Sequence, residues 1–339
     1  NSKKLREGIA MRLFVFGCRP YDEDEIFRRL ALEYHREISH TPEQLTMDNL
    51  EDYIPMLRGH EAVSVVATPI NREMLEAMHE AGVRLLSTRT IGYDHIEIAA
   101  AKALGITVCN AGYDPDAVAD YAVMLMLMAL RNEKRILQRA NLHDFSMPGL
   151  IGRQLRGCTV GIVGAGKIGA RVMESLQGFG CKVLYWNRTE KSGLPGTQVP
   201  FDVLCRESDI LSLHLPLTEE THHLISREVI ASIKPGAILV NTARGALVDS
   251  EALIDALESG HLSGAALDVV EGEAGLYHFN KMSDQIKNRS LSILKDMPNV
   301  IVTPHMAFYT REAVEQMARC SLEACRYFEA GGENPWKIC

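Results

Sequence analysis

The sequence predicts an α/β protein with two doubly wound parallel-sheet domains. Three observations support this prediction. The chain has 339 residues, which exceeds the usual size of a single hydrophobic core. Short apolar, β-prone runs alternate with helical patterns along most of the chain. A glycine-rich turn near residue 164 opens a second series of such runs, and the hydrophobic content of 46% is enough for two cores.

The first series of elements begins just after Met11. Its predicted strands are residues 12–17, 62–67 and 84–88, and its predicted helices include residues 22–33, 72–81 and 96–104. Residues 1–10 are polar and lack the apolar centre of a signal peptide, so we expect a leader, tag or frayed end there. This alternation of strands and helices favours a parallel sheet for the first domain.

A long helix is expected from Asp116, directly after Pro115, to about Ala140. Its most apolar part, residues 121–130, is about half the length that a bilayer requires, so we predict no contact with a membrane. The formal net charge of −8 also argues against a general nucleic-acid binder, because such proteins need a clustered basic surface.

The second series contains six β-rich runs joined by helical segments. The runs are residues 159–163, 182–185, 210–215, 237–241, 264–268 and 300–303. Six such strands match a doubly wound sheet of the dinucleotide-binding type. After them, residues 311–328 form an amphipathic pattern that predicts a final helix.

The glycine loop Gly164–Gly169 lies between a predicted strand and a predicted helix, which is the context that G-x-G-x-x-G requires. Gly164 permits the tight turn, Gly166 lets the backbone approach a pyrophosphate, and Gly169 lets the helix pack on the strand. The helix N-terminus supplies N–H donors for the phosphates. We therefore predict that this loop binds a nicotinamide dinucleotide.

The residue that ends the next strand bears on the choice between NAD and NADP. Asn187 occupies the position at which a carboxylate usually binds the ribose 2′-hydroxyl of NAD. Without that negative charge, Arg188 and Thr189 are able to bind a 2′-phosphate. NADP is therefore favoured over NAD, although a solvent-directed Arg188 would allow both cofactors.

Three polar residues follow three later strands, and the carboxyl ends of parallel strands face the ligand crevice of an open sheet. They are Arg244, Glu273 and His305. Arg244 is suited to bind a carboxylate with two parallel hydrogen bonds. Next to Glu273, a protonated His305 would supply the proton that the carbonyl of a 2-oxo acid needs when it accepts a hydride. The pattern predicts an oxidoreductase that acts on a 2-oxo or 2-hydroxy acid.

No metal site is predicted. The adjacent residues His222 and His223 are expected to face different ways at the surface, and His214, with Pro216, is expected to line the adenosine side of the dinucleotide site. The eight cysteines are scattered without a C-x-x-C pair, which is typical of reduced thiols in a cytoplasmic protein.

Several motifs together resemble the D-isomer-specific 2-hydroxyacid dehydrogenases, and in particular the D-lactate dehydrogenase branch of that family. The motifs are T-R-T-I-G-Y-D at residues 88–94, the glycine loop, N-T-A-R-G at 241–245, L-D-V-V-E-G-E at 267–273 and T-P-H-M-A-F-Y-T at 303–310. Other stretches are similar to D-lactate dehydrogenases of vancomycin resistance and to clostridial 2-hydroxyacid dehydrogenases. The likeness extends from about Met11 to Phe328, and it implies a D-lactate dehydrogenase-like activity that extends to bulkier 2-oxo acids.

The resemblance implies a Rossmann dinucleotide-binding domain, residues 113–308, inserted in a flavodoxin-like substrate domain, residues 11–112 and 309–339. It also implies a homodimer and hinges near residues 113–115 and 308–310. Its implied catalytic set is Arg244, Glu273 and His305, and its implied substrate contacts are Ile91, Gly92, Tyr113 and Phe308. The expected cofactor contacts, with Asp268 at the nicotinamide carboxamide, are Gly164, Gly166, Lys167, Ile168, Gly169, Asn187, Arg188, Thr189, His214, Pro216, Thr242, Ala243 and Asp268.

One alternative stays open at this point. A dinucleotide-sensing binding protein of the same fold, similar to the C-terminal-binding corepressors, retains the same three polar residues. Oxidation of formate on this scaffold is disfavoured, because it calls for an amide beside the histidine instead of Glu273.

Overall fold

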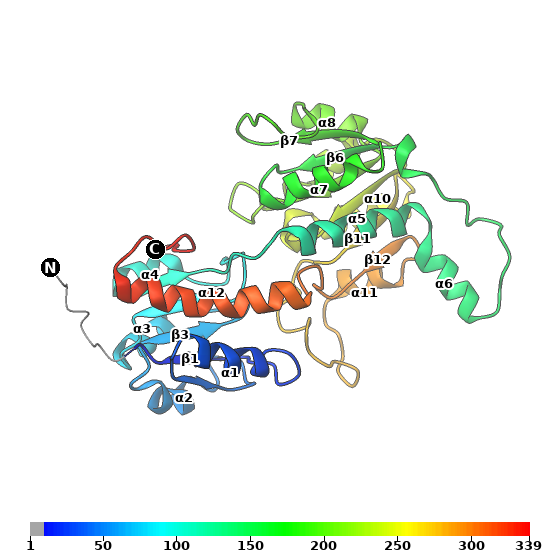
Figure 1. Ribbon diagram of the computed structural model, residues 1–339. Helices are drawn as coiled ribbons and strands as arrows, with labels where there is room; N and C mark the ends of the chain where they lie inside the picture. The colour runs from blue at the N-terminus through cyan, green and yellow to red at the C-terminus, as the bar shows by residue number, and fades with distance from the viewer. Residues whose placement is uncertain (1–9) are drawn as a thin grey trace. The chain divides into compact units, whose positions relative to one another are not determined.

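The computed structural model describes residues 10–339, and the chain divides into two compact units (Figure 1). Unit 1 contains the residues up to Asp114 together with Thr310–Cys339, and unit 2 is Pro115–Tyr309. Unit 2 is therefore inserted between two parts of unit 1. The predicted leader, apart from Ala10, lies outside the described residues.

Unit 1 is built on a five-stranded sheet in the order β2-β1-β3-β4-β5, and every neighbouring pair is parallel. The strands are β1 (Leu13–Val15), β2 (Ile38–His40), β3 (Ala62–Val65), β4 (Leu85–Thr88) and β5 (Thr107–Cys109). This order is that of the flavodoxin-like doubly wound fold, as predicted. The sequence analysis did not identify β2 and β5, which have three residues each.

The helices of unit 1 cover both faces of this sheet (Figure 1). They are α1 (Asp24–Glu33), α2 (Leu50–Leu57), α3 (Arg72–Glu80), α4 (Ile98–Leu104) and α12 (Arg311–Ala330). Alternate residues of β1 point to opposite faces. Leu13 and Val15 join the core under α1 and α12, whereas Phe14 packs in the core on the other face. The final helix was correctly predicted, and its first turn is capped by the Thr310 side chain, which accepts a hydrogen bond from the Ala313 N–H.

Unit 2 contains a seven-stranded parallel sheet in the order β12-β11-β10-β9-β6-β7-β8. Its strands are β6 (Thr159–Val163), β7 (Lys182–Trp186), β8 (Thr197–Gln198), β9 (Ile210–Leu213), β10 (Ala237–Asn241), β11 (Leu262–Leu267) and β12 (Val300–Val302). The strand order reverses between β6 and β9, and such a switch point is where open α/β sheets bind ligands. All six predicted strands are present, and the two-residue β8 is additional.

Two hydrophobic cores pack on the faces of this sheet. The helices are α5 (Asp116–Leu130), α6 (Glu133–Asn141), α7 (Lys167–Gln177), α8 (Phe201–Glu207), α9 (Arg227–Ser232), α10 (Ser250–Glu258) and α11 (Arg289–Asp296), with short 3₁₀ turns η1 (Leu155–Gly157) and η2 (Gly245–Leu247). The prediction of one helix from Asp116 to Ala140 is wrong. Asn132 adopts a left-handed conformation, with φ of 55°, and separates α5 from α6.

Among residues 10–339, no helix combines the length and the apolar character that crossing a membrane requires.

Candidate active site

Three strand ends of unit 2 carry the residues that the sequence analysis placed together. Arg244 follows β10, Asp268 follows β11, and His305 follows β12. Glu273 lies in the turn after Asp268. Because β10, β11 and β12 are adjacent and parallel, their carboxyl ends share one edge of the sheet.

His305 and Glu273 form the central pair of this edge. Nδ1 of His305 lies 2.6 Å from Oε1 of Glu273, and Oε2 of the same carboxylate accepts the Val270 N–H at 2.8 Å. The carboxylate therefore fixes the imidazole through Nδ1, and Nε2 is the nitrogen directed away from Glu273. Both side chains are partly buried, so the pair is partly shielded from water.

The backbone at His305 is left-handed, with φ of 54°. Its N–H donates to the carbonyl oxygens of Asp268 and Thr303, at 2.8 and 3.0 Å. Residues other than glycine rarely occupy this region, and they do so where the surrounding structure holds them. The conformation at His305 is thus imposed by the adjacent strand end.

The side chain of Asp268 organises the loop that carries His305. This carboxylate is fully buried and accepts three hydrogen bonds, from the Thr303 hydroxyl at 2.6 Å and from the backbone N–H groups of Met306 and Ala307 at 2.8 Å each. The family resemblance implied that Asp268 contacts the nicotinamide carboxamide, and the sequence analysis did not identify its role in holding this loop. Its donors lie more than thirty residues away in the sequence, so no local pattern indicates them.

Arg244 begins the 3₁₀ turn η2, and buried Asn241 shapes the turn before it. The Asn241 amide donates to the Arg244 carbonyl at 2.8 Å, and its oxygen accepts the Ala243 N–H at 3.0 Å. A Cβ atom at Gly245 would lie 2.1 Å from the Val270 carbonyl carbon, so only glycine permits this close approach. The close packing at Gly245 joins the Arg244 segment to the turn that carries Glu273.

The glycine loop has the geometry that a dinucleotide requires. Gly164 has φ of 98°, and a Cβ at Gly169 would lie 2.0 Å from the Gly164 carbonyl oxygen, so both positions require glycine. A Cβ at Gly166 would meet no described atom within 4 Å, which leaves room for a phosphate next to the backbone. Lys167 and Ile168 form the first turn of α7, whose N–H groups point toward that space.

Asn187 couples the glycine loop to the end of β7. Its oxygen accepts the Ala165 N–H at 3.1 Å, and its amide donates to the carbonyl and the hydroxyl of Thr189, at 2.9 and 3.1 Å. Arg188 is exposed. The end of β7 thus presents a neutral amide and an exposed cation in place of a carboxylate.

His214 directly follows β9 and lies beside the glycine loop, since a Cβ at Gly164 would lie 2.7 Å from its carbonyl oxygen. Its Nε2 lies 2.9 Å from the Ser212 hydroxyl, and desolvation lowers the pKa of His214 to about 4. The ring is therefore neutral at pH 7.

The other predicted cofactor contacts lie in two loops. After β9, Pro216 is exposed and its carbonyl accepts a hydrogen bond from the Thr221 hydroxyl. After β10, Thr242 is buried and Ala243 is partly buried.

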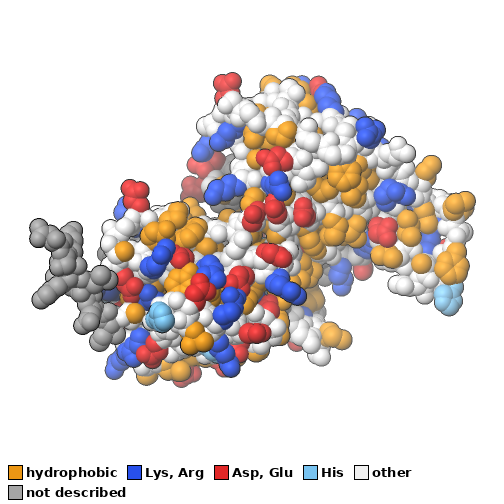
Figure 2. Space-filling view, viewed as in Figure 1, with side chains coloured by type: hydrophobic (Ala, Val, Ile, Leu, Met, Phe, Trp, Pro, Cys, Tyr) orange, Lys and Arg blue, Asp and Glu red, His pale blue; other side chains and the backbone are white. Residues whose placement is uncertain are grey.

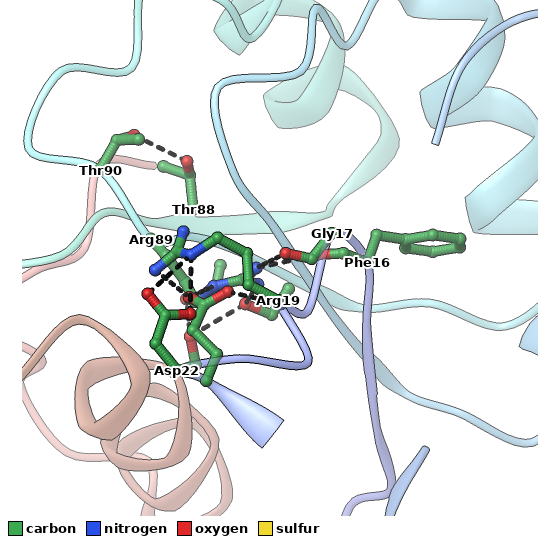
Figure 3. Close-up of polar contacts among 11 residues, drawn as sticks. Phe16, Gly17, Arg19, Asp22, Thr88, Arg89 and Thr90 are labelled. Carbon is green, nitrogen blue, oxygen red and sulfur yellow. Dashed lines mark hydrogen bonds and ion pairs between the residues drawn. The ribbon is translucent and has the colours of Figure 1, made fainter. Parts of the chain in front are cut away.

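In unit 1, the segment with Ile91 and Gly92 follows β4 and is held from both sides. Thr90 donates to the Gly92 carbonyl at 2.6 Å, and the Asn110 amide donates to the Ile91 carbonyl at 2.7 Å. Figure 3 shows the Thr88 and Thr90 hydroxyls, which lie 2.8 Å apart, above the buried Arg89. These bonds fix the two carbonyl groups.

The remaining predicted substrate contacts are aromatic. Tyr113 belongs to unit 1 and is partly buried. Phe308 belongs to unit 2, where its ring lies 5.9 Å from the His278 ring and 6.3 Å from the His305 ring. Phe308 thus stands beside the imidazole of the central pair.

One expectation about the histidines is wrong. His222 and His223 do not face different ways: their ring centroids are 4.1 Å apart, and both Nε2 atoms approach Glu271. The left-handed backbone at His223, with φ of 49°, turns the second ring back toward the first.

Comparison with known proteins agrees with this architecture. The family described as the NAD-binding domain of D-isomer-specific 2-hydroxyacid dehydrogenases matches residues 123–307. A D-specific alpha-keto acid dehydrogenase of Enterococcus faecium is 47% identical over 321 residues, which are 94% of this chain and 98% of the relative. An aromatic 2-oxoacid reductase of Clostridium sporogenes is 38% identical and covers 95% of this chain and 97% of its own length.

Solved structures show the same likeness over the whole fold. A D-lactate dehydrogenase from Treponema pallidum superposes with a TM-score of 0.85 at 33% identity, covering 97% of this chain and all of its own. A D-2-hydroxyisocaproate dehydrogenase gives a TM-score of 0.85 at 31% identity, with coverage of 97% and 99%. These relatives are enzymes, which favours the enzymatic prediction over a dinucleotide-sensing binding protein. The chain therefore belongs to the D-isomer-specific 2-hydroxyacid dehydrogenase family, and it is an NAD-dependent oxidoreductase that reduces 2-oxo acids to D-2-hydroxy acids.

Proposed function

We propose that Arg244, Glu273 and His305 carry out the reaction. The observation that supports this most strongly is the 2.6 Å contact between His305 and Glu273 at the carboxyl edge of the sheet. In the reductive direction, His305 donates its Nε2 proton to the carbonyl oxygen of the 2-oxo acid as the carbonyl carbon accepts a hydride. Glu273 stabilises the protonated imidazole before the transfer and keeps the ring in one orientation.

Arg244 anchors the substrate in this proposal. A guanidinium forms two parallel hydrogen bonds with a carboxylate, which fixes the plane of the 2-oxo acid. In unit 1, Ile91 and Gly92 are proposed to contact the substrate through their backbone N–H groups, since their carbonyl groups already accept hydrogen bonds from Asn110 and Thr90. The dinucleotide, when bound at the glycine loop, supplies the hydride.

For the cofactor, we propose a preference for NADPH over NADH. Three features support it: the amide of Asn187 carries no charge that would repel a 2′-phosphate, Arg188 is exposed beside it, and the Thr189 hydroxyl lies within the same turn. Substituting Asn187→Asp should lower kcat/KM for NADPH and raise it for NADH. A wild-type enzyme that uses NADH more efficiently than NADPH would contradict this preference.

The substrate is proposed to be a 2-oxo acid with a side chain bulkier than the methyl group of pyruvate. Phe308 and His278 place two aromatic rings next to His305, and aromatic faces favour contact with apolar or aryl groups. Initial rates with pyruvate, 2-oxoisocaproate and phenylpyruvate, each with NADH and with NADPH, test both proposals together. Higher kcat/KM for pyruvate than for the two larger acids would refute the proposed substrate.

A homodimer is proposed from the exposed apolar side chains of one segment. Leu142, Phe145, Met147 and Ile151, which follow α6, are each 79–92% exposed, and hydrophobic atoms gather over this region in Figure 2. Monomeric proteins rarely leave such side chains together in water. Light scattering should give twice the chain mass, and Phe145→Asp with Ile151→Asp should give a monomer.

The cytoplasm is the proposed location, because the cysteines have the character of reduced structural thiols. All eight are unpaired, and desolvation raises the pKa of Cys18, Cys109 and Cys325 to about 12, so these thiols stay protonated. Slow labelling of the native protein by a thiol reagent, with full labelling after denaturation, is the expected result.

A further inference from the structure

We propose that His222, His223 and Glu271 form a binding site for a divalent transition-metal ion such as Zn²⁺. The three side chains lie in unit 2, and their ligand atoms are all within 4.8 Å of one another. Nε2 of His223 lies 3.0 Å from Oε1 of Glu271, and Nε2 of His222 lies 4.0 Å from the same oxygen. None of the three belongs to the proposed catalytic set.

These distances suit a single ion. With Zn–N and Zn–O distances near 2.0–2.1 Å, tetrahedral geometry separates two ligand atoms by about 3.3 Å. The distances of 3.0 and 4.0 Å lie on either side of that value. Side-chain rotations that bring the three ligand atoms to this spacing would place one ion between both imidazoles and the carboxylate, with water in the fourth position.

The backbone already holds the two histidines in place. His222 donates its N–H to the Thr218 carbonyl at 2.9 Å, and His223 donates its N–H to the Ala246 carbonyl at 2.8 Å. The left-handed conformation of His223 brings the two adjacent rings to one side, at an interplanar angle of 31°. The backbone of both histidines is therefore already ordered, and metal binding would have to order only the side chains.

Glu271 is held from two directions. The Asn288 amide donates to its carbonyl oxygen at 2.8 Å, and the Ser250 hydroxyl donates to Oε2 at 3.4 Å. Oε2 is thereby occupied, while Oε1 faces the two imidazoles. The carboxylate is about one-third exposed, so a hydrated ion has access to the site.

The kinds of ligand determine which ions fit. Two imidazole nitrogens with one carboxylate oxygen suit Zn²⁺, Ni²⁺, Co²⁺ and Cu²⁺. Mg²⁺ and Ca²⁺ require mainly oxygen ligands and should not compete. The bound ion would join the segment of His222 and His223 to the turn of Glu271, and so should stabilise unit 2 against unfolding.

The test uses the untagged full chain, because a histidine tag would bind the same ions, and removes endogenous metal with a chelator. Calorimetric titration should show one Zn²⁺ per chain, and Zn²⁺ should raise the melting temperature in a concentration-dependent way. Mg²⁺ should have no effect. Co²⁺ should give visible absorption bands of low-coordinate cobalt with nitrogen ligands.

Substitutions of the three proposed ligands test whether they bind the ion. His222→Ala, His223→Asn and Glu271→Gln should each weaken Zn²⁺ binding at least tenfold, and asparagine at 223 tolerates the left-handed backbone. Wild-type turnover and circular dichroism without metal show that each variant is folded. His79→Ala, which changes an exposed histidine of unit 1, is the matched control and should bind Zn²⁺ normally.

Two results would overturn the proposal. One is the absence of Zn²⁺ binding to the wild type at millimolar concentration. The other is binding that persists unchanged in the triple variant, which would assign the ion to a different group, such as the partly exposed thiols of Cys181 and Cys339.

Discussion

Glu23 and Arg89 form an ion pair in the interior of unit 1, and neutralising Glu23 should strongly destabilise that unit. Both side chains are 0% exposed, and Nε of Arg89 lies 3.0 Å from Oε1 of Glu23. The same guanidinium donates to the Ser64 hydroxyl and to the carbonyls of Phe16 and Gly17, as Figure 3 shows in part. Arg89 is therefore fixed by the fold and is not able to turn toward water.

The burial of the pair allows the loss in the free energy of unfolding to be estimated. Two unit charges 3.0 Å apart attract by about 5.5 kcal/mol at an effective dielectric constant near 20. Glu23→Gln keeps a side-chain oxygen as an acceptor but leaves a buried cation without its counter-charge, and breaking such pairs typically costs about 3–5 kcal/mol. That loss is comparable with the whole stability of many domains.

The two tryptophans allow the loss to be measured in unit 1 alone. Trp336 belongs to unit 1 and Trp186 to unit 2. In a Trp186→Phe background, the fluorescence change in urea reports the unfolding of unit 1, and Glu23→Gln should lower its free energy of unfolding by about 3–5 kcal/mol.

A surface pair of the same unit provides the control. Glu76 lies 3.7 Å from Arg72, and both side chains are about half exposed, so Glu76→Gln should leave the urea midpoint unchanged. A second variant, Glu23→Leu with Arg89→Met, removes both charges and should recover part of the lost stability; the rest stays lost because the carbonyls of Phe16 and Gly17 then lack their donor. If Glu23→Gln costs less than about 1 kcal/mol, the buried pair does not contribute as argued.

Three further predictions concern the site and the pH dependence of stability. Arg244→Gln should raise KM for the 2-oxo acid and lower kcat, whereas His305→Gln should mainly lower kcat; wild-type kinetics in either variant would refute its assigned role. Gly169→Ala should raise KM for the dinucleotide at least tenfold, since the new Cβ would lie 2.0 Å from the Gly164 carbonyl oxygen, and an unchanged KM would show that the loop adapts. Burial lowers the pKa of His60, so the unfolded chain binds a proton more readily than the folded chain, and the stability of unit 1 should fall as the pH drops below about 6.5. When the urea midpoint is measured between pH 5 and 7.5, it should depend less on pH in His60→Asn than in the wild type. An equal pH dependence in both proteins would contradict this reasoning.

The meeting of the functional residues at one edge of the sheet was predictable, because the sequence places one polar residue after each of three buried strands. Parallel strands bring those ends to one edge whatever the details of the helices. The sequence alone therefore predicts that Arg244 and His305 lie at the same edge of the sheet. Short strands such as β8 and β2 escaped prediction, because two or three residues carry too little periodicity to distinguish a strand from a loop.

Other features were not predictable, because they depend on backbone angles that the residue types alone do not reveal. Asn132 separates α5 from α6 by adopting a left-handed conformation, although the apolar and charged pattern continues across it. His223 does the same and brings two rings together that an extended or helical backbone would separate. Histidine and asparagine adopt the left-handed backbone region more readily than most residues do. Most histidines nevertheless lie outside that region, so the residue type alone does not predict this conformation.

The hydrogen bonds of Asp268 connect the fold to the proposed catalytic role of His305. His305 has a left-handed backbone, which costs of the order of 1–3 kcal/mol and persists only if neighbouring contacts require it. Asp268 meets that requirement, since its carboxylate accepts the N–H groups of Met306 and Ala307 and its carbonyl accepts the N–H of His305. A carboxylate offers acceptors on both oxygens, whereas an asparagine would turn an N–H₂ group toward one of these donors. The buried charge at the end of β11 therefore sets the direction of the imidazole that Glu273 then holds.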